Sequence, residues 1–250
     1  MRAIDHYAWT NRWRNRHPVE KLLPAFSLLL LTLLLPPLTT GPLVVLLTAL
    51  ATVQGAGVPL HAFWTVMAVP AAFLLAGAPF LAVSVSFIGG VNLHISPDGA
   101  WLALETTVRA LAAVSCLAFL TLTTPLVDWA PLLRRMGTPA SLVELILLMY
   151  RLIFVFAERA LTGYQAQAAR LGYARFDRSL HSTGLLAGNL FQRGLDRARR
   201  LEIGLAARGY AGELRVLTPD RSLSWWRLAT AMLLVGSIGL LGGWLAREGS

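Results

Sequence analysis

Two short stretches of this chain combine an arginine with small residues in a pattern that suits docking to another protein. They read Ala169-Arg170-Leu171-Gly172 and Ala207-Arg208-Gly209, and their arginines are 38 residues apart (208 − 170). Alanine and glycine let the backbone approach a partner closely, and glycine favours the end of a helix. The planar arginine fork binds a carboxylate through two hydrogen bonds, which lysine does not reproduce. We therefore predict partner docking at both stretches, through Ala169, Arg170, Gly172, Ala207, Arg208 and Gly209.

We call residues 169–172 the first Ala-Arg signature and residues 207–209 the second. The competing interpretation is that Arg170 and Arg208 are solvated residues in front of ordinary glycine caps. Each match is short and weak by itself, but two matches within one basic segment favour docking. Leu171 is inserted before the glycine of the first signature, so we expect a less regular helix end at Arg170 than at Arg208.

Two predicted helices carry the signatures. Residues 139–172 form a long, largely apolar helical pattern, and residues 185–207 form an amphipathic one. In the second pattern, apolar residues share one side and arginines lie on the opposite side: Leu195, Ala198, Leu201 and Leu205 against Arg193, Arg197 and Arg200. Each signature therefore stands at the carboxyl end of a helix.

The composition is that of a membrane protein. Of the 250 residues, 56% are hydrophobic and 14% are charged, whereas soluble domains carry about 25% charged residues. Residues 22–125 contain only three charged side chains besides two histidines, namely Asp98, Glu105 and Arg109. Such long uncharged runs predict an all-α polytopic membrane protein.

Five membrane-spanning helices are predicted, at residues 22–38, 43–53, 59–81, 101–124 and 228–243. Pro36-Pro37 ends the first, and Gly41-Pro42 is expected to form a tight turn before the second. Residues 83–100, which include Gly89-Gly90, are predicted as an external loop or re-entrant segment, and residues 210–224 as a polar linker. Glu105 and Arg109 are four residues apart, so an interfacial ion pair is favoured over a functional role for them.

Most of the basic residues, 17 of 22 (5 + 12), lie in two segments. Residues 1–21 carry five of them and residues 158–227 carry twelve. By the positive-inside rule, both segments lie on the cytoplasmic side of the membrane. Residues 141–157 are apolar enough to cross, but they include Glu144 and Arg151, and a charge at mid-bilayer costs about 2.5–3.5 kcal/mol. We therefore predict that this helix lies at the cytoplasmic interface.

The predicted organisation has three parts. Residues 1–125 form an interfacial segment and a four-helix membrane region with a cytoplasmic N-terminus. Residues 126–224 form a cytoplasmic domain with two long helices of amphipathic character. Residues 225–250 form a C-terminal transmembrane helix.

Several functions are disfavoured by the sequence. No G-x-x-x-x-G-K-[ST] motif occurs and Lys21 is the only lysine, so any nucleotide hydrolysis must come from another chain. The five histidines and Cys116 show no metal-ligand spacing, so we predict neither a metal nor a cofactor. Because the basic charge lies beside apolar spans, we also predict no nucleic-acid binding.

Two further classes stay open at this stage. A membrane-embedded enzyme acting on a lipid or prenyl substrate needs clustered carboxylates or an activated nucleophile, and no Asp-x-x-Asp cluster occurs. A purely structural assembly subunit is the other class. Co-purified chains distinguish a subunit of an assembly from such an enzyme, which would turn over lipid alone.

The predicted architecture and the paired signatures resemble the T component, the transmembrane coupling subunit, of energy-coupling-factor (ECF) importers. The N-terminus is similar to the cobalt-type CbiQ family in two places. These are Asp5-x-x-Ala8-x-x-Asn11 and His17-Pro18-x-x-Lys21-Leu22. The resemblance extends over nearly the whole chain.

This resemblance implies a non-catalytic subunit of the bacterial cytoplasmic (inner) membrane that transmits ATPase motion to a substrate-binding membrane subunit. It also implies that residues 126–224 form a coupling domain with two coupling helices. The implied partners are two cytoplasmic ATPases, the substrate-binding membrane subunit (S component), a small accessory membrane subunit and the lipid bilayer. Each Ala-Arg signature is expected to enter a groove on one ATPase. The implied cargo is cobalt ion for cobalamin synthesis, with nickel or a vitamin as the alternative.

Overall fold

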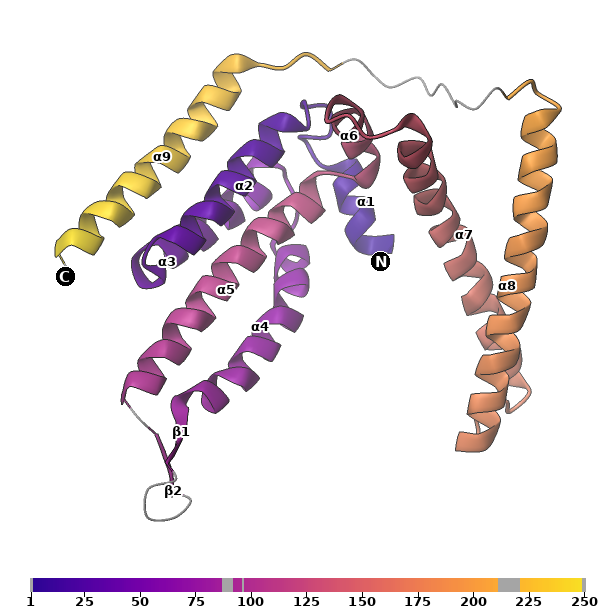
Figure 1. The fold of residues 1–250 in the computed structure, drawn as a ribbon, viewed down its shortest axis with the longest axis horizontal. Coiled ribbons are helices and arrows are strands. Elements are labelled where there is room, and N and C mark those ends of the chain that lie inside the picture. The colour runs from indigo at the N-terminus through magenta and orange to yellow at the C-terminus, as the bar shows by residue number, and fades with distance from the viewer. Residues whose placement is uncertain (1, 87–91, 96, 211–220, 249–250) are drawn as a thin grey trace. The chain divides into compact units, whose positions relative to one another are not determined.

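The structure is a computed structural model that describes residues 2–86, 92–95, 97–210 and 221–248 (Figure 1). It divides into two compact units. The first comprises Met1–Pro125 with Pro219–Ser250, and the second comprises Leu126–Thr218. Helices dominate both units, which confirms the predicted all-α class.

The first unit is built around one long helix. It contains α1 (Arg2–Thr10), α2 (Val19–Leu34), α3 (Pro37–Leu50), α4 (Leu60–Ala82), α5 (Pro97–Thr123) and α9 (Trp225–Glu248). Helix α3 continues into a π-helical turn over Ala51–Gly55. Helix α5 packs against α1, α2, α3 and α4, while α9 packs against α2 and α3. The chain's last helix is therefore part of the same bundle as its first helices.

Two clusters of buried side chains form the core of the first unit. One joins α4 to α5 and includes Phe63 and Leu122. The other joins α2, α3, α5 and α9 and includes Leu28, Val44 and Val235. These clusters place the apolar faces of the helices against each other, as the hydropathy pattern predicts.

The Gly41-Pro42 pair lies inside α3 instead of forming the predicted turn. A Cβ atom added at Gly41 would stand 2.5 Å from Val108 Cγ1 on α5. The glycine is therefore needed for close contact between two helices, a common use of small residues in membrane bundles. The turn prediction is wrong because the helix already begins at Pro37, a residue that suits a first helical position.

Five described helical segments are long and apolar enough to cross a membrane: Pro37–Gly55, Leu60–Ala82, Pro97–Thr123, Ala140–Ala169 and Trp225–Leu245. Five spans are also predicted from the sequence, but the two sets differ. The predicted span at residues 22–38 is absent from the structural set, and Ala140–Ala169 is present in it instead. Helix α2 has 16 residues, about 24 Å, which is shorter than the predicted first span. It ends at Leu34 because Leu35 is extended before Pro36, as residues before proline prefer.

A short antiparallel ribbon connects α4 to α5, where the sequence predicts a loop. Strand β1 (Val83–Ser86) pairs with strand β2 (Asn92–Ile95), with Ser84 opposite His94. Gly89-Gly90, part of the predicted external loop, lies outside the described residues. The predicted ion pair between Glu105 and Arg109 is not formed in the described part of α5, and Arg109 Nε is buried without a hydrogen-bond partner.

The second unit contains two long helices joined by a short turn. A 3-10 turn (Leu126–Trp129) and α6 (Ala130–Arg135) lead into α7 (Ala140–Ala169), which is followed by α8 (Phe176–Ala206). Helices α7 and α8 pack together and run in opposite directions. Helix α8 begins nine residues before the predicted start at residue 185, directly after the short turn that follows α7. Residues 211–220 of the predicted linker (210–224) lie outside the described residues.

Candidate docking surfaces

The first Ala-Arg signature forms a tight left-handed end on α7. The helix ends at Ala169, and Leu171 has a positive φ of 58°. The Leu171 N–H donates to Ala168 O (3.0 Å), and the Gly172 N–H donates to Gln167 O (2.9 Å). These two backward bonds around a left-handed residue define a Schellman motif, which satisfies the last carbonyls of a helix.

The second Ala-Arg signature forms the same structure at the end of α8. Gly209 has a φ of 72°. The Gly209 N–H donates to Ala206 O (3.0 Å), and the Tyr210 N–H donates to Leu205 O (3.1 Å). Ala207 and Arg208 precede the left-handed residue, as Ala169 and Arg170 do in the first signature.

When the two signatures are aligned by backbone geometry, the residues that correspond differ from those paired by the sequence pattern. Leu171 takes the place of Gly209, and Gly172 takes the place of Tyr210. The less regular helix end expected at Arg170 is not observed, because the backbone hydrogen bonds match in both signatures. Leu171 therefore occupies the left-handed position that Gly209 occupies in the second signature, and it is not an inserted residue.

Gly172 is required by the packing of the next helix. A Cβ atom added there would lie 2.8 Å from Ser182 Oγ and 2.9 Å from Gln167 O. The Ser182 hydroxyl also donates to Gly172 O (2.9 Å), and Tyr173 Oη donates to Gln167 Oε1 (2.7 Å). The turn between α7 and α8 is thus held by side chains on both sides, which fixes the position of Arg170.

Leu171→Gly should stabilise the protein, because a leucine in the left-handed region costs about 1–2 kcal/mol. The side chain is 67% exposed, so its removal loses little packing, and part of the gain is offset by the greater unfolded-state entropy of glycine. We expect a net gain of about 0.5–1 kcal/mol, measured as a higher Tm in detergent. Gly209→Leu is the matched control and should lower the Tm, because open space surrounds that position and only the backbone is strained.

Both arginines are exposed, and the two signatures are far apart within the second unit. Arg170 and Arg208 are solvent-exposed, as are Ala169, Gly209 and Ala207. The signatures lie at opposite ends of α8 (Figure 1), whose 31 residues span about 46 Å. Next to Arg170, an open hollow is lined by Leu171, Gly172, Asp177, Arg178, His181 and Ser182. The structure therefore presents two separate basic surfaces.

A buried carboxylate ties the second signature to the start of α7. The Glu144 side chain is 7% exposed, and its Oε2 accepts a hydrogen bond from Tyr210 Oη (3.1 Å). Arg134 of α6 lies 3.7 Å from Glu144 Oε1. The sequence identifies Glu144 only as a charge in an apolar run and gives no signal for Tyr210 as its partner. Their bond positions Arg208, two residues before the tyrosine.

The N-terminal motif forms a cap over the end of α5. Asn11 Nδ2 donates to Thr123 O (3.2 Å), and Lys21 Nζ donates to the same oxygen (2.9 Å) and to Trp13 O (3.1 Å). Lys21 is 1% exposed and Ala8 is 1% exposed. A cation at the carboxyl end of a helix is favourable for the helix dipole. The motif residues are therefore structural in this chain.

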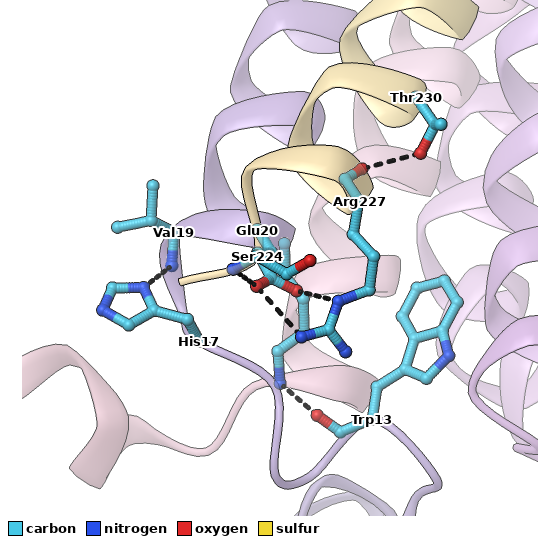
Figure 2. A network of polar contacts seen from close by, with 8 residues as sticks. Trp13, His17, Val19, Glu20, Ser224, Arg227 and Thr230 are labelled. Carbon is cyan, nitrogen blue, oxygen red and sulfur yellow. Dashed lines mark hydrogen bonds and ion pairs between the residues drawn. The ribbon is translucent and has the colours of Figure 1, made fainter. Parts of the chain in front are cut away.

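His17 and Glu20 extend this cap toward α9. The Val19 N–H at the start of α2 donates to His17 Nδ1 (3.3 Å). Glu20 accepts the Ser224 N–H (2.8 Å) and pairs with Arg227 Nε at 3.3 Å (Figure 2). The Glu20 side chain is 3% exposed, and it holds the start of α9 against α2. Within the described residues, no group of three or more His, Cys, Asp or Glu side chains is placed to bind a metal ion.

The chain is similar to known transport proteins over most of its length. A family model described as "Cobalt transport protein" (CbiQ) matches residues 10–219. The cobalt transport protein CbiQ of Rhodobacter capsulatus is 44% identical over 217 residues, which cover 86% of this chain and 87% of that protein. CbiQ of Salmonella typhimurium is 28% identical over 226 residues, covering 86% of this chain and 100% of that protein.

A fused protein is also similar. The putative fused cobalt transport protein CbiMQ of Methanocorpusculum labreanum is 34% identical over 125 residues, which cover 50% of this chain and 21% of that protein. The family match spans well over half of the chain, and it includes both Ala-Arg signatures and the Asn11, His17 and Lys21 cap. The chain therefore belongs to the CbiQ family of cobalt transport proteins.

Proposed function

We propose that this chain is the transmembrane coupling subunit of an ATP-driven, ECF-type importer for cobalt ion that supplies cobalamin synthesis. In this role it transmits ATPase motion to a substrate-binding membrane subunit and has no catalytic activity of its own. The observation that carries the proposal is the pair of helix ends with matching Schellman geometry, each with an exposed arginine in front of the left-handed residue. Membership of a cobalt transport family supports the cargo.

The geometry of the signatures favours two separate protein partners. Each arginine projects from a helix end whose backbone is already fixed by hydrogen bonds, so binding a carboxylate in a groove requires little further ordering of the backbone. The separation of about 46 Å along α8 suits one docking site on each of two cytoplasmic ATPases. Leu171 adds an exposed apolar side chain beside Arg170. Its strained backbone is the type of feature that persists at functional sites.

The coupling step then follows from the rigidity of the second unit. ATP-driven approach of the two ATPases moves the two signatures, and α7 and α8 carry this motion as continuous helices. Glu144 keeps the end of α8 attached to the start of α7 through Tyr210, so the two docking points move with one framework. The name of the fused CbiMQ relative supports a partner membrane subunit for this chain.

The proposed topology places the N-terminus and the coupling domain (126–224) in the cytoplasm. Helix α7 is long and apolar enough to cross the membrane. We place it at the cytoplasmic interface because Arg151 is exposed on it and because crossing would export the basic segment that follows. On this topology the protein is a multi-pass protein of the cytoplasmic membrane, with both Ala-Arg signatures accessible to cytoplasmic ATPases.

Co-purification combined with uptake tests the proposal. The tagged chain, expressed with the genes beside it and extracted in mild detergent, should retain two copies of an ATPase and one small membrane protein. Cells that express this assembly should accumulate radioactive cobalt, and an ATPase variant without its catalytic carboxylate should abolish accumulation. ATP-independent cobalt uptake by the chain alone contradicts the coupling role, and preference for nickel over cobalt contradicts the cargo.

A further inference from the structure

The first unit contains a cavity that is apolar along most of its length and basic at one end. Its volume is about 130 Å³. It lies between α2, α3, α5 and α9, and its apolar walls include Leu28, Phe119 and Val235. Its polar end is formed by Arg16, Glu20 and Arg227, part of which is drawn in Figure 2. The cavity therefore has the amphipathic character of a lipid molecule.

The cavity extends along the helices from this polar end. On α2 the lining residues run from Glu20 to Leu28, and on α9 they run from Arg227 to Val235. Eight residues of helix span about 12 Å. A volume of about 130 Å³ takes only part of one acyl chain, so a ligand needs an apolar portion that lies along this strip and a polar group at one end only.

The charges at the polar end do not balance. Arg227 pairs with Glu20, whose side chain is 3% exposed, at 3.3 Å. Arg16 is stacked over the Trp13 ring, with its Cζ 4.3 Å from the ring centroid. Burial and then the positive charge of Arg227 lower the pKa of Arg16, while Glu20 opposes this shift. Among the described residues that line this end, two guanidinium groups face one carboxylate, which leaves a positive excess that favours an anion.

We propose that this cavity binds an anionic phospholipid, with part of one acyl chain in the apolar part and the headgroup phosphate at Arg16 and Arg227. Basic pockets between membrane helices are known sites for anionic headgroups. A free phosphate uses only the polar end. A zwitterionic lipid such as phosphatidylcholine brings its own cation beside the phosphate, so it neutralises less of the excess positive charge than an anionic lipid does. An anionic lipid satisfies both ends of the cavity, and its chemistry does not depend on the proposed transport role.

Native mass spectrometry of the purified full-length chain in detergent tests this site. Phosphatidylglycerol and phosphatidylcholine with identical acyl chains are added separately. We expect about fivefold more phosphatidylglycerol adduct, the equivalent of one basic residue near an anionic surface. Inorganic phosphate alone should neither form an adduct nor displace the lipid. Equal retention of the two lipids, or an adduct with inorganic phosphate, overturns the proposal.

Two pairs of variants separate this site from general lipid binding. Arg16→Gln should remove the preference for phosphatidylglycerol, whereas Arg14→Gln should keep it, because Arg14 stacks on Trp9 (4.4 Å) outside the cavity. Ala231→Phe places an aromatic ring in the apolar part and should reduce the adduct, whereas Leu233→Phe on the same helix should not. Equal effects within either pair show that the lipid binds elsewhere.

Discussion

Arg208→Glu should sever the association with one ATPase while the chain still inserts into the membrane. Removing one partner of a desolvated, hydrogen-bonded charge pair costs about 2–5 kcal/mol at an interface, and the new glutamate also repels the partner's carboxylate. The expected loss of affinity is therefore at least about 30-fold. Retained ATPase is measured in a detergent pull-down from the co-expressed assembly, and cobalt accumulation is measured in the same cells.

Arg199→Glu is the matched control for Arg208→Glu. It lies on the same helix, is exposed and changes the net charge by the same amount, but it is two turns from the signature. If this control releases the ATPase as strongly as Arg208→Glu, general electrostatic attraction explains binding and the docking assignment is wrong. Arg170→Glu should match Arg208→Glu in size, because both arginines precede the left-handed residue of the same motif.

Lys21→Met should be strongly destabilising, although methionine is close to lysine in size. Lys21 is 1% exposed, and its ammonium donates to Thr123 O and Trp13 O. Hydrogen bonds to a charged group contribute about 1.5–3 kcal/mol each, and the buried carbonyls would lose a donor. We expect a loss of about 2–4 kcal/mol, seen as a lower Tm in detergent. Lys21→Gln, which keeps one donor group, should lie between the wild type and Lys21→Met.

The composition of the chain offers a second measurement of the same contact. Lys21 is the only lysine in the sequence, so amine-specific reductive methylation reports on this side chain and the N-terminus alone. The folded protein should resist methylation at Lys21, and the denatured protein should be modified. Rapid modification of the folded protein, or a Tm of Lys21→Met equal to that of the wild type, contradicts the buried cap.

The apolar helices were predictable because long runs without charge determine them. Predicted residues 59–81 correspond to α4 (Leu60–Ala82), and residues 101–124 fall largely within α5 (Pro97–Thr123). Gly41-Pro42 was misassigned because a glycine used for close helix packing looks the same in sequence as a glycine used for a turn. Only the tertiary contact with Val108 distinguishes the two.

The candidate docking surfaces were predictable in residue type but not in geometry. Arg170 and Arg208 are readable as a repeated pattern at helix ends. The equivalence of Leu171 and Gly209 is hidden, because sequence alignment pairs glycine with glycine while the backbone pairs the left-handed residues. The contact between Glu144 and Tyr210 joins residues 66 positions apart, and no local pattern indicates such a pairing.

Glu20 and Lys21 are adjacent residues whose hydrogen bonds fix both ends of the segment that contains the second unit. Lys21 donates to Thr123 O just before that unit begins, and Glu20 accepts the Ser224 N–H just after it ends. Closing a loop of about 100 residues costs about 4 kcal/mol in chain entropy. Packing of the helices in the first unit already brings these two ends together. The second unit therefore does not have to offset this entropy cost while it folds. A force applied along α7 or α8 therefore reaches the first unit through two chain connections, and each connection is fixed by one residue of this dipeptide.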